Sequence, residues 1–211
     1  AIDDLTDAYH DTTTDFDGDL SDNDDNLALG HEFPALDGAN PGARNVAVGA
    51  RSAATLTTAD DTVSVGYNAG SSLTSGRQNT FVGSGAGRDV STGLFNTLIG
   101  FSAGRDMSTG SNNTLVGESA GVNTQGGSNT SIGANTLFRN TTGSNNTVLG
   151  EGAAFGSTNG ARENNTLIGY RAGYAMEPGS NNNIFMGYQA GDVVTTGTDN
   201  IIIGYDIDHS S

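Results

Sequence analysis

The chain has 211 residues, of which 34% are hydrophobic and 32 are glycine, with no cysteine and a formal net charge of −16. The lack of cysteine excludes disulfides and thiolate chemistry, and the scarcity of cations argues against binding to nucleic acid or to an anionic membrane. No apolar run approaches the roughly 18 residues of a membrane span, so we expect no membrane insertion.

Residues 1–44 are predicted to form an acidic N-terminal capping segment that ends in one degenerate repeat. Ten of the first 25 residues are Asp and none is Lys or Arg. Alternating carboxylates suit Ca²⁺, which takes six to eight oxygen ligands. The candidate ligands are Asp15, Asp17, Asp19 and Asp22. The EF-hand pattern fails because Leu20 and Asn26 stand where Gly and Glu are needed, so a solvated acidic loop is favoured over a calcium site. We expect no other cofactor.

Residues 45–205 repeat one short motif, Asn-Thr-aliphatic-aliphatic-Gly-x-x-Ala-Gly, followed by residues 206–211 as a tail. The glycine that closes each apolar pair recurs every 16 to 19 residues, at positions 30, 49, 66, 83, 100, 117, 133, 150, 169, 187 and 204. A fixed short period over most of a chain indicates a solenoid. We therefore predict an all-β fold, a parallel β-roll or β-solenoid of about eleven coils of ~17 residues each.

Side chains alternate between the two faces of a strand, so each repeat offers two candidate rows. The residue before the repeat glycine is aliphatic in every coil, and we predict that this row forms the core of each coil. From the second coil onward, this predicted core consists of Val48, Val65, Val82, Ile99, Val116, Ile132, Leu149, Ile168, Met186 and Ile203.

The row one residue earlier would point the other way, and a monomer would expose its apolar side chains to water. We therefore predict that this row makes the contact between chains. Its large members are Phe81, Leu98, Leu115, Val148, Leu167, Phe185 and Ile202.

The repeats resemble a known group of proteins. Residues 45–49 (Asn-Val-Ala-Val-Gly) and 62–66 (Thr-Val-Ser-Val-Gly) resemble the strand motif of trimeric autotransporter adhesin heads. The 17-residue form is similar to repeats of phage tail fibres and of bacterial surface proteins that end in an endosialidase-type chaperone domain. The resemblance implies a left-handed parallel β-roll, assembled as a homotrimer and located outside the cell on a bacterial surface or a virion fibre.

The expected function is that of a structural or adhesive fibre segment that presents a surface to a glycan or protein receptor, without catalysis. A glycan-processing tailspike domain is the first alternative. It would need two carboxylates that flank a groove, whereas Glu118, Glu151, Glu163 and Glu177 are scattered over turns.

Ice binding by rows of threonine is the second alternative. It is disfavoured because the threonines share the parity of the predicted core row, and because the strands lack a second threonine row. These threonines are Thr80, Thr97, Thr114, Thr130, Thr147 and Thr166.

Overall fold

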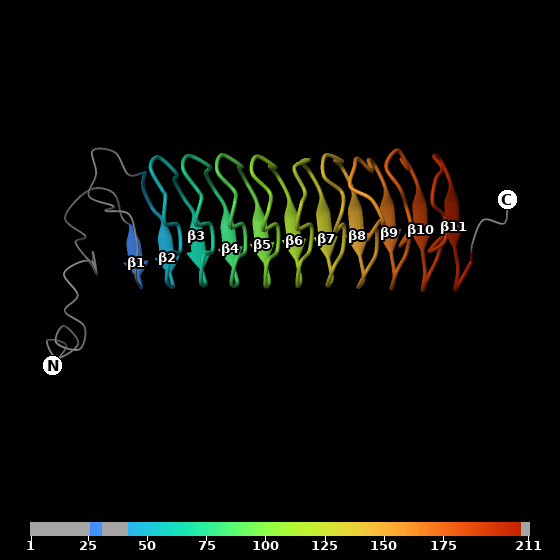
Figure 1. The fold of residues 1–211 in the computed structure, drawn as a ribbon, viewed down its shortest axis with the longest axis horizontal. Helices are drawn as coiled ribbons and strands as arrows, with labels where there is room; N and C mark the ends of the chain where they lie inside the picture. The colour runs from blue at the N-terminus through green and yellow to red at the C-terminus, as the bar shows by residue number, and fades with distance from the viewer. Residues whose placement is uncertain (1–25, 31–41, 208–211) are drawn as a thin grey trace, which may run out of the picture.

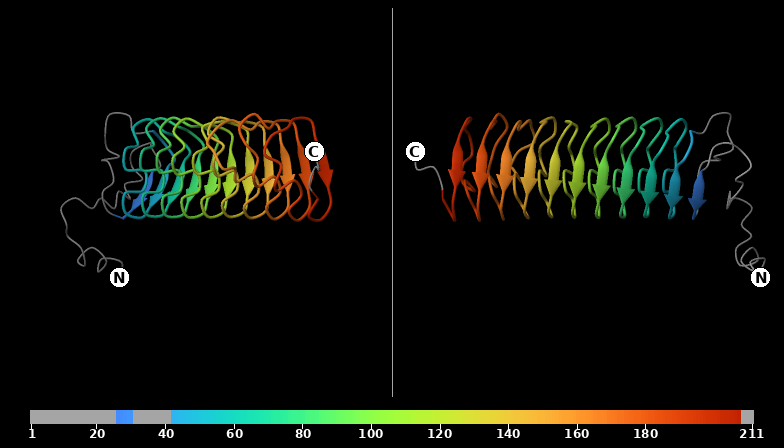
Figure 2. Two further views of the ribbon diagram at one scale, coloured as in Figure 1. Left: turned by 45° about the vertical axis from the view of Figure 1, so that its right-hand side comes forward. Right: turned by 180° about the vertical axis from the view of Figure 1, so that it is seen from behind.

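The computed structural model describes residues 26–30 and 42–207, which form one elongated parallel β-solenoid (Figure 1). Each coil contributes one three-residue strand, and loops return the chain to the next strand on the opposite side of the coil (Figure 2). The strands are β1 (Leu27–Leu29), β2 (Val46–Val48), β3 (Val63–Val65), β4 (Thr80–Val82), β5 (Thr97–Ile99), β6 (Thr114–Val116), β7 (Thr130–Ile132), β8 (Thr147–Leu149), β9 (Thr166–Ile168), β10 (Ile184–Met186) and β11 (Ile201–Ile203). Each strand pairs in parallel with the next in chain order, which confirms the predicted all-β parallel solenoid.

The repeat register is also the register of the sheet. Thr97 pairs with Thr114, Leu98 with Leu115, and the same one-to-one pairing runs from β1 to β11. Equivalent residues of successive repeats therefore form straight rows along the long axis of the solenoid.

The glycine after each strand is required by the close approach of neighbouring coils. Gly100 has a φ of 133°, and a Cβ built on it would lie 2.4 Å from the carbonyl oxygen of Gly117. No side chain fits at such a distance, so the glycine recurs once per coil.

A ladder of buried asparagines precedes the strands. The backbone N–H of Asn113 donates to Oδ1 of Asn96 at 3.0 Å, and Nδ2 of Asn113 donates to the carbonyl oxygen of Gly126 at 3.0 Å. Oδ1 of Asn113 in turn accepts from the backbone N–H of Asn129 at 3.0 Å. Each asparagine thus satisfies backbone groups of the turn and of the next coil, which would otherwise be buried without partners.

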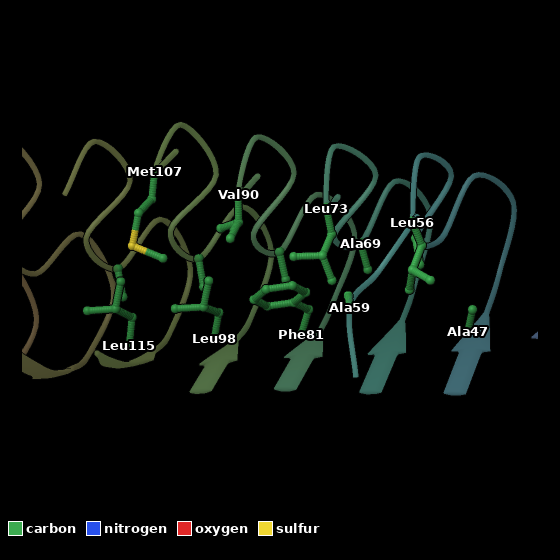
Figure 3. Packing of buried hydrophobic residues seen from close by; sticks show 14 of the residues in the cluster. Ala47, Leu56, Ala59, Ala69, Leu73, Phe81, Val90, Leu98, Met107 and Leu115 are labelled. Carbon is green, nitrogen blue, oxygen red and sulfur yellow. The ribbon is translucent and has the colours of Figure 1, made fainter. Parts of the chain in front are cut away.

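The structure contradicts the predicted assignment of the two strand faces. The row assigned to the contact between chains lies inside the coil, where its side chains are at most 7% exposed: Phe81, Leu98, Leu115, Val148, Leu167, Phe185 and Ile202. Figure 3 shows Phe81, Leu98 and Leu115 rising from their strands toward Val90 and Met107 on the opposite wall of the roll. These side chains make the core of each coil and are not free to contact a second chain.

The row predicted to be the core faces outward instead, and this prediction was wrong. Its members are half-buried or exposed; Ile99 is 37% exposed and Ile132 is 42% exposed. The corrected row comprises Val48, Val65, Val82, Ile99, Val116, Ile132, Leu149, Ile168, Met186 and Ile203. Uniform aliphatic character misled the prediction, because both faces of these strands are apolar.

The inner row varies in size because the opposite wall of the coil compensates for it. Phe81 is large, and a Cβ on Gly70 or Gly87 would lie within 2.7 Å of its ring. In the coil of β7 the inner residue is the small Ser131, and Leu137 occupies the position equivalent to those glycines and is 1% exposed. Large and small residues therefore alternate across the core, as close packing requires.

Candidate functional site

The outward side of the strands forms one of two candidate functional surfaces, here called the sheet face. It consists of the first and third residues of β1 to β11, and none of these residues is charged. In the middle of the solenoid the first-residue row is threonine: Thr80, Thr97, Thr114, Thr130, Thr147 and Thr166. At a strand spacing of about 4.8 Å, eleven strands give an uncharged strip about 50 Å long.

The second surface arises where the repeat becomes irregular, in the coils of β8 and β9. The step between repeat glycines lengthens from Gly150 to Gly169 and again to Gly187, because residues 155–163 and 174–181 form longer loops. Insertions into solenoid coils map to loops on one side, often a binding side.

A buried arginine anchors these longer loops. Arg162 is 1% exposed, and its guanidinium donates to the carbonyl oxygens of Met176 at 2.6 Å, Thr158 at 2.9 Å and Arg139 at 3.2 Å. Burial lowers the pKa of Arg162, and the carboxylate of Glu177 opposes that shift. The guanidinium therefore supplies hydrogen-bond donors to three loop carbonyl oxygens and links the loops that carry them.

Aromatic rings from three successive coils stack beside the anchored loops. Phe138 and Phe155 have ring centroids 5.1 Å apart, as do Phe155 and Tyr174, with interplanar angles of 12° and 6°. The guanidinium carbon of Arg171 lies 4.8 Å from the ring centroid of Tyr174 and 5.3 Å from that of Tyr170. The rings thereby hold Arg171 by cation–π contacts, although its side chain is solvent-exposed.

A hollow of about 230 Å³ opens beside this stack, here called the aromatic hollow. Gly152 contributes backbone alone to its lining, and a Cβ there would lie 3.4 Å from Arg171 Cγ. The hollow is lined by Asn135, Glu151, Gly152, Phe155, Arg171 and Tyr174. It combines half-buried aromatic rings with a cation, a carboxylate and an amide that face solvent.

The carboxylates considered for catalysis are not brought together. Glu151 lines the hollow, and the hydroxyls of Ser157 and Thr158 donate to Glu177. Glu118 follows β6 and occupies the coil position that Glu151 occupies after β8, two coils away. The described residues thus supply one carboxylate to the hollow and no carboxylate pair across it.

The candidate calcium ligands Asp15, Asp17, Asp19 and Asp22 lie outside the described residues. Within residues 26–30 and 42–207, no three His, Cys, Asp or Glu side chains gather as a metal site would require. The same part of the chain contains no helix of the length and apolar character needed to span a bilayer.

The sequence-based prediction missed the aromatic hollow. Its signal was present, because Phe138, Phe155 and Tyr174 each stand five residues after a repeat glycine and must therefore stack in neighbouring coils. Reading the repeats for equivalent positions, rather than for local motifs, would have found them.

No protein-family model, no curated protein and no solved structure matches this chain.

Proposed function

We propose that the chain is a structural and adhesive segment of an extracellular fibre, a left-handed β-roll that assembles as a homotrimer through its sheet face. The observation that supports assembly is the uncharged sheet face, in which Ile99 and Ile132 are 37% and 42% exposed in the single chain. A continuous apolar strip of this length marks an interaction surface. The number of three follows from the resemblance of the repeats to trimeric adhesin heads.

The proposal changes which residues make the contact between chains. The outward aliphatic row, including Ile99 and Val116, takes the place of the inner row that contains Leu98 and Leu115. Parallel copies would then place their aliphatic rows together near the axis and leave the loops of the coil at the surface, available to a glycan or protein receptor.

Light scattering tests the assembly. The wild type is expected to give three times the chain mass of 21.4 kDa. Val116→Asp places three carboxylates near the axis, where their repulsion opposes association, so it is expected to give folded monomers. Thr109→Asp, at an exposed turn, is the matched control and should remain trimeric. A monomeric wild type, or a Val116→Asp variant that stays trimeric at wild-type stability, would contradict the proposal.

Ice binding is a second candidate, which the corrected strand parity favours. The six threonines point outward in register, beside a row of aliphatic side chains, so the argument that they lie inside the coil no longer applies. The second row remains aliphatic rather than threonine. Ice binding and trimer formation compete for the same face, so a monomer with thermal hysteresis would support ice binding, and a trimer without it would support the fibre segment.

We assign no glycoside-hydrolase role to the described residues, because that reaction needs two carboxylates across one groove and the aromatic hollow has one.

A further inference from the structure

We propose that the aromatic hollow binds one pyranose unit of a glycan. This inference rests on the proposed adhesive function and assigns its receptor contact to the coils of β7, β8 and β9. The sheet face plays no part in it.

The lining of the hollow has the chemistry that a sugar ring requires. A pyranose has an apolar face of C–H groups and a rim of hydroxyls, so a site for it needs aromatic surface beside polar groups that both donate and accept. The faces of the half-buried Phe155 ring lie against Phe138 and Tyr174, and the Tyr174 ring is held between Phe155 and Arg171, so Phe155 and Tyr174 offer the edges of their rings to the apolar side of a sugar. Small-molecule sites typically combine such apolar walls with a few placed polar groups.

The polar groups of the hollow match a hydroxyl rim. The Arg171 guanidinium donates only, the Glu151 carboxylate accepts only, and the Asn135 amide does both. One cation and one anion leave the hollow without net charge, which favours a neutral sugar over a phosphate or a carboxylated ligand. Hydrogen bonds to charged groups are stronger than those between neutral groups, so Arg171 and Glu151 are expected to supply most of the orientation.

The hollow also lies where the chain departs from its regular repeat. The residue five positions after the repeat glycine is polar in several other coils, as at Ser71, Arg88 and Arg105, whereas three consecutive coils here carry stacked aromatic rings. Two of these three coils, those of β8 and β9, hold the lengthened loops and the buried Arg162 that anchors them. Neither feature occurs in the regular coils of β2 to β6.

The test begins with a glycan array and continues with isothermal titration and saturation-transfer NMR, using the methyl glycosides of glucose, galactose and N-acetylglucosamine as soluble probes. Wild-type protein is expected to bind glycans that contain a neutral pyranose. Glu151→Gln and Tyr174→Ala are each expected to weaken binding at least about tenfold. Tyr174→Phe keeps the ring and should retain most of the affinity.

Two matched controls separate the hollow from the rest of the solenoid. Glu118→Gln alters the equivalent coil position after β6, and Tyr188→Ala removes a ring that stacks on Tyr170 and Tyr205 outside the hollow. Both controls should bind like the wild type. Glu151 is exposed, so Glu151→Gln keeps the test decisive even if Tyr174→Ala fails to fold.

The outcomes distinguish this inference from the proposed function. Glycan binding that survives in Glu151→Gln and Tyr174→Ala would overturn the hollow as the site while leaving an adhesive fibre segment in place. Absence of any pyranose binding by a wild-type trimer would also overturn the hollow as a sugar site. A monomeric wild type that binds a pyranose through the hollow would support the sugar site and would contradict the trimeric fibre.

Discussion

The exchange of bulk between Ser131 and Leu137 provides a sharp test of which strand face is buried. In the coil of β6 the equivalent residues are Leu115 and Gly121, and a Cβ on Gly121 would lie 2.6 Å from Leu115 Cδ1. The double change Ser131→Leu with Leu137→Gly should therefore convert the coil of β7 to the arrangement of its neighbour. Each change alone should lower the free energy of unfolding.

The magnitudes follow from burial and backbone geometry. Leu137 is 1% exposed, and removing a buried leucine costs about 2–5 kcal/mol. Its φ of 51° favours glycine, which returns about 1–2 kcal/mol. Ser131→Leu alone overpacks the coil against Leu137 at a cost of about 1–3 kcal/mol. Independent effects would therefore sum to about 1–7 kcal/mol.

The double variant is expected within about 1 kcal/mol of the wild type, because the new leucine fills the space that Leu137 leaves. The hydroxyl of Thr136, which Ser131 contacts at 2.7 Å, keeps its hydrogen bond to the carbonyl oxygen of Gly133 at 2.9 Å. Urea unfolding of the two single variants and the double variant measures the coupling. The control pair Ile132→Ala with Leu137→Gly joins an outward to an inward residue and should be additive within about 0.5 kcal/mol. Additivity in the test pair would refute the assignment of Ser131 to the interior.

Two further predictions concern the asparagine ladder and the ion pair between the adjacent residues Arg88 and Asp89. Asn113→Ala leaves the carbonyl oxygen of Gly126 and the backbone N–H of Asn129 without partners, so it is expected to lower the free energy of unfolding in urea by about 2–4 kcal/mol. The control Asn159→Ala, in an exposed loop, should lower it by less than about 0.5 kcal/mol. Equal effects of the two substitutions would contradict a stabilising role of the asparagine ladder. The side-chain hydrogen bond from Arg88 holds the pKa of Asp89 in the folded chain below its usual 3.8, so the folded chain binds this proton less readily than the unfolded chain. The pair therefore stabilises the fold fully above the unfolded pKa, and this stabilisation is lost as the pH falls through the lowered pKa of the folded chain. Between pH 5 and pH 3, urea unfolding should show a smaller loss of stability in Asp89→Asn than in the wild type. The difference should stay below about 1 kcal/mol, because the Arg88–Asp89 pair is partly exposed. If the variant and the wild type lose the same stability, the pair does not contribute to the pH dependence.

The period of the sequence by itself determined the architecture. Repeats of one motif can satisfy their backbone groups by stacking in register, so the strands, their order, the glycine after each strand and the asparagine before it all followed from the spacing. Asn96 and Asn113 bond to each other because they occupy the same place in successive coils. The stacking of equivalent residues in successive coils thus follows from the period of the sequence.

The tertiary structure alone decided which strand face is inside. A segment such as Thr114-Leu115-Val116 is apolar at two adjacent positions, so alternation gives no preference between the faces. The deciding contact comes from the opposite wall of the coil, where Gly121 makes room for Leu115 and Leu137 fills the space beside Ser131. For the aromatic hollow, the period of the sequence places the rings in one row, but the structure shows that Glu151 and Arg171, which lie 20 residues apart in the chain, border the same hollow in neighbouring coils.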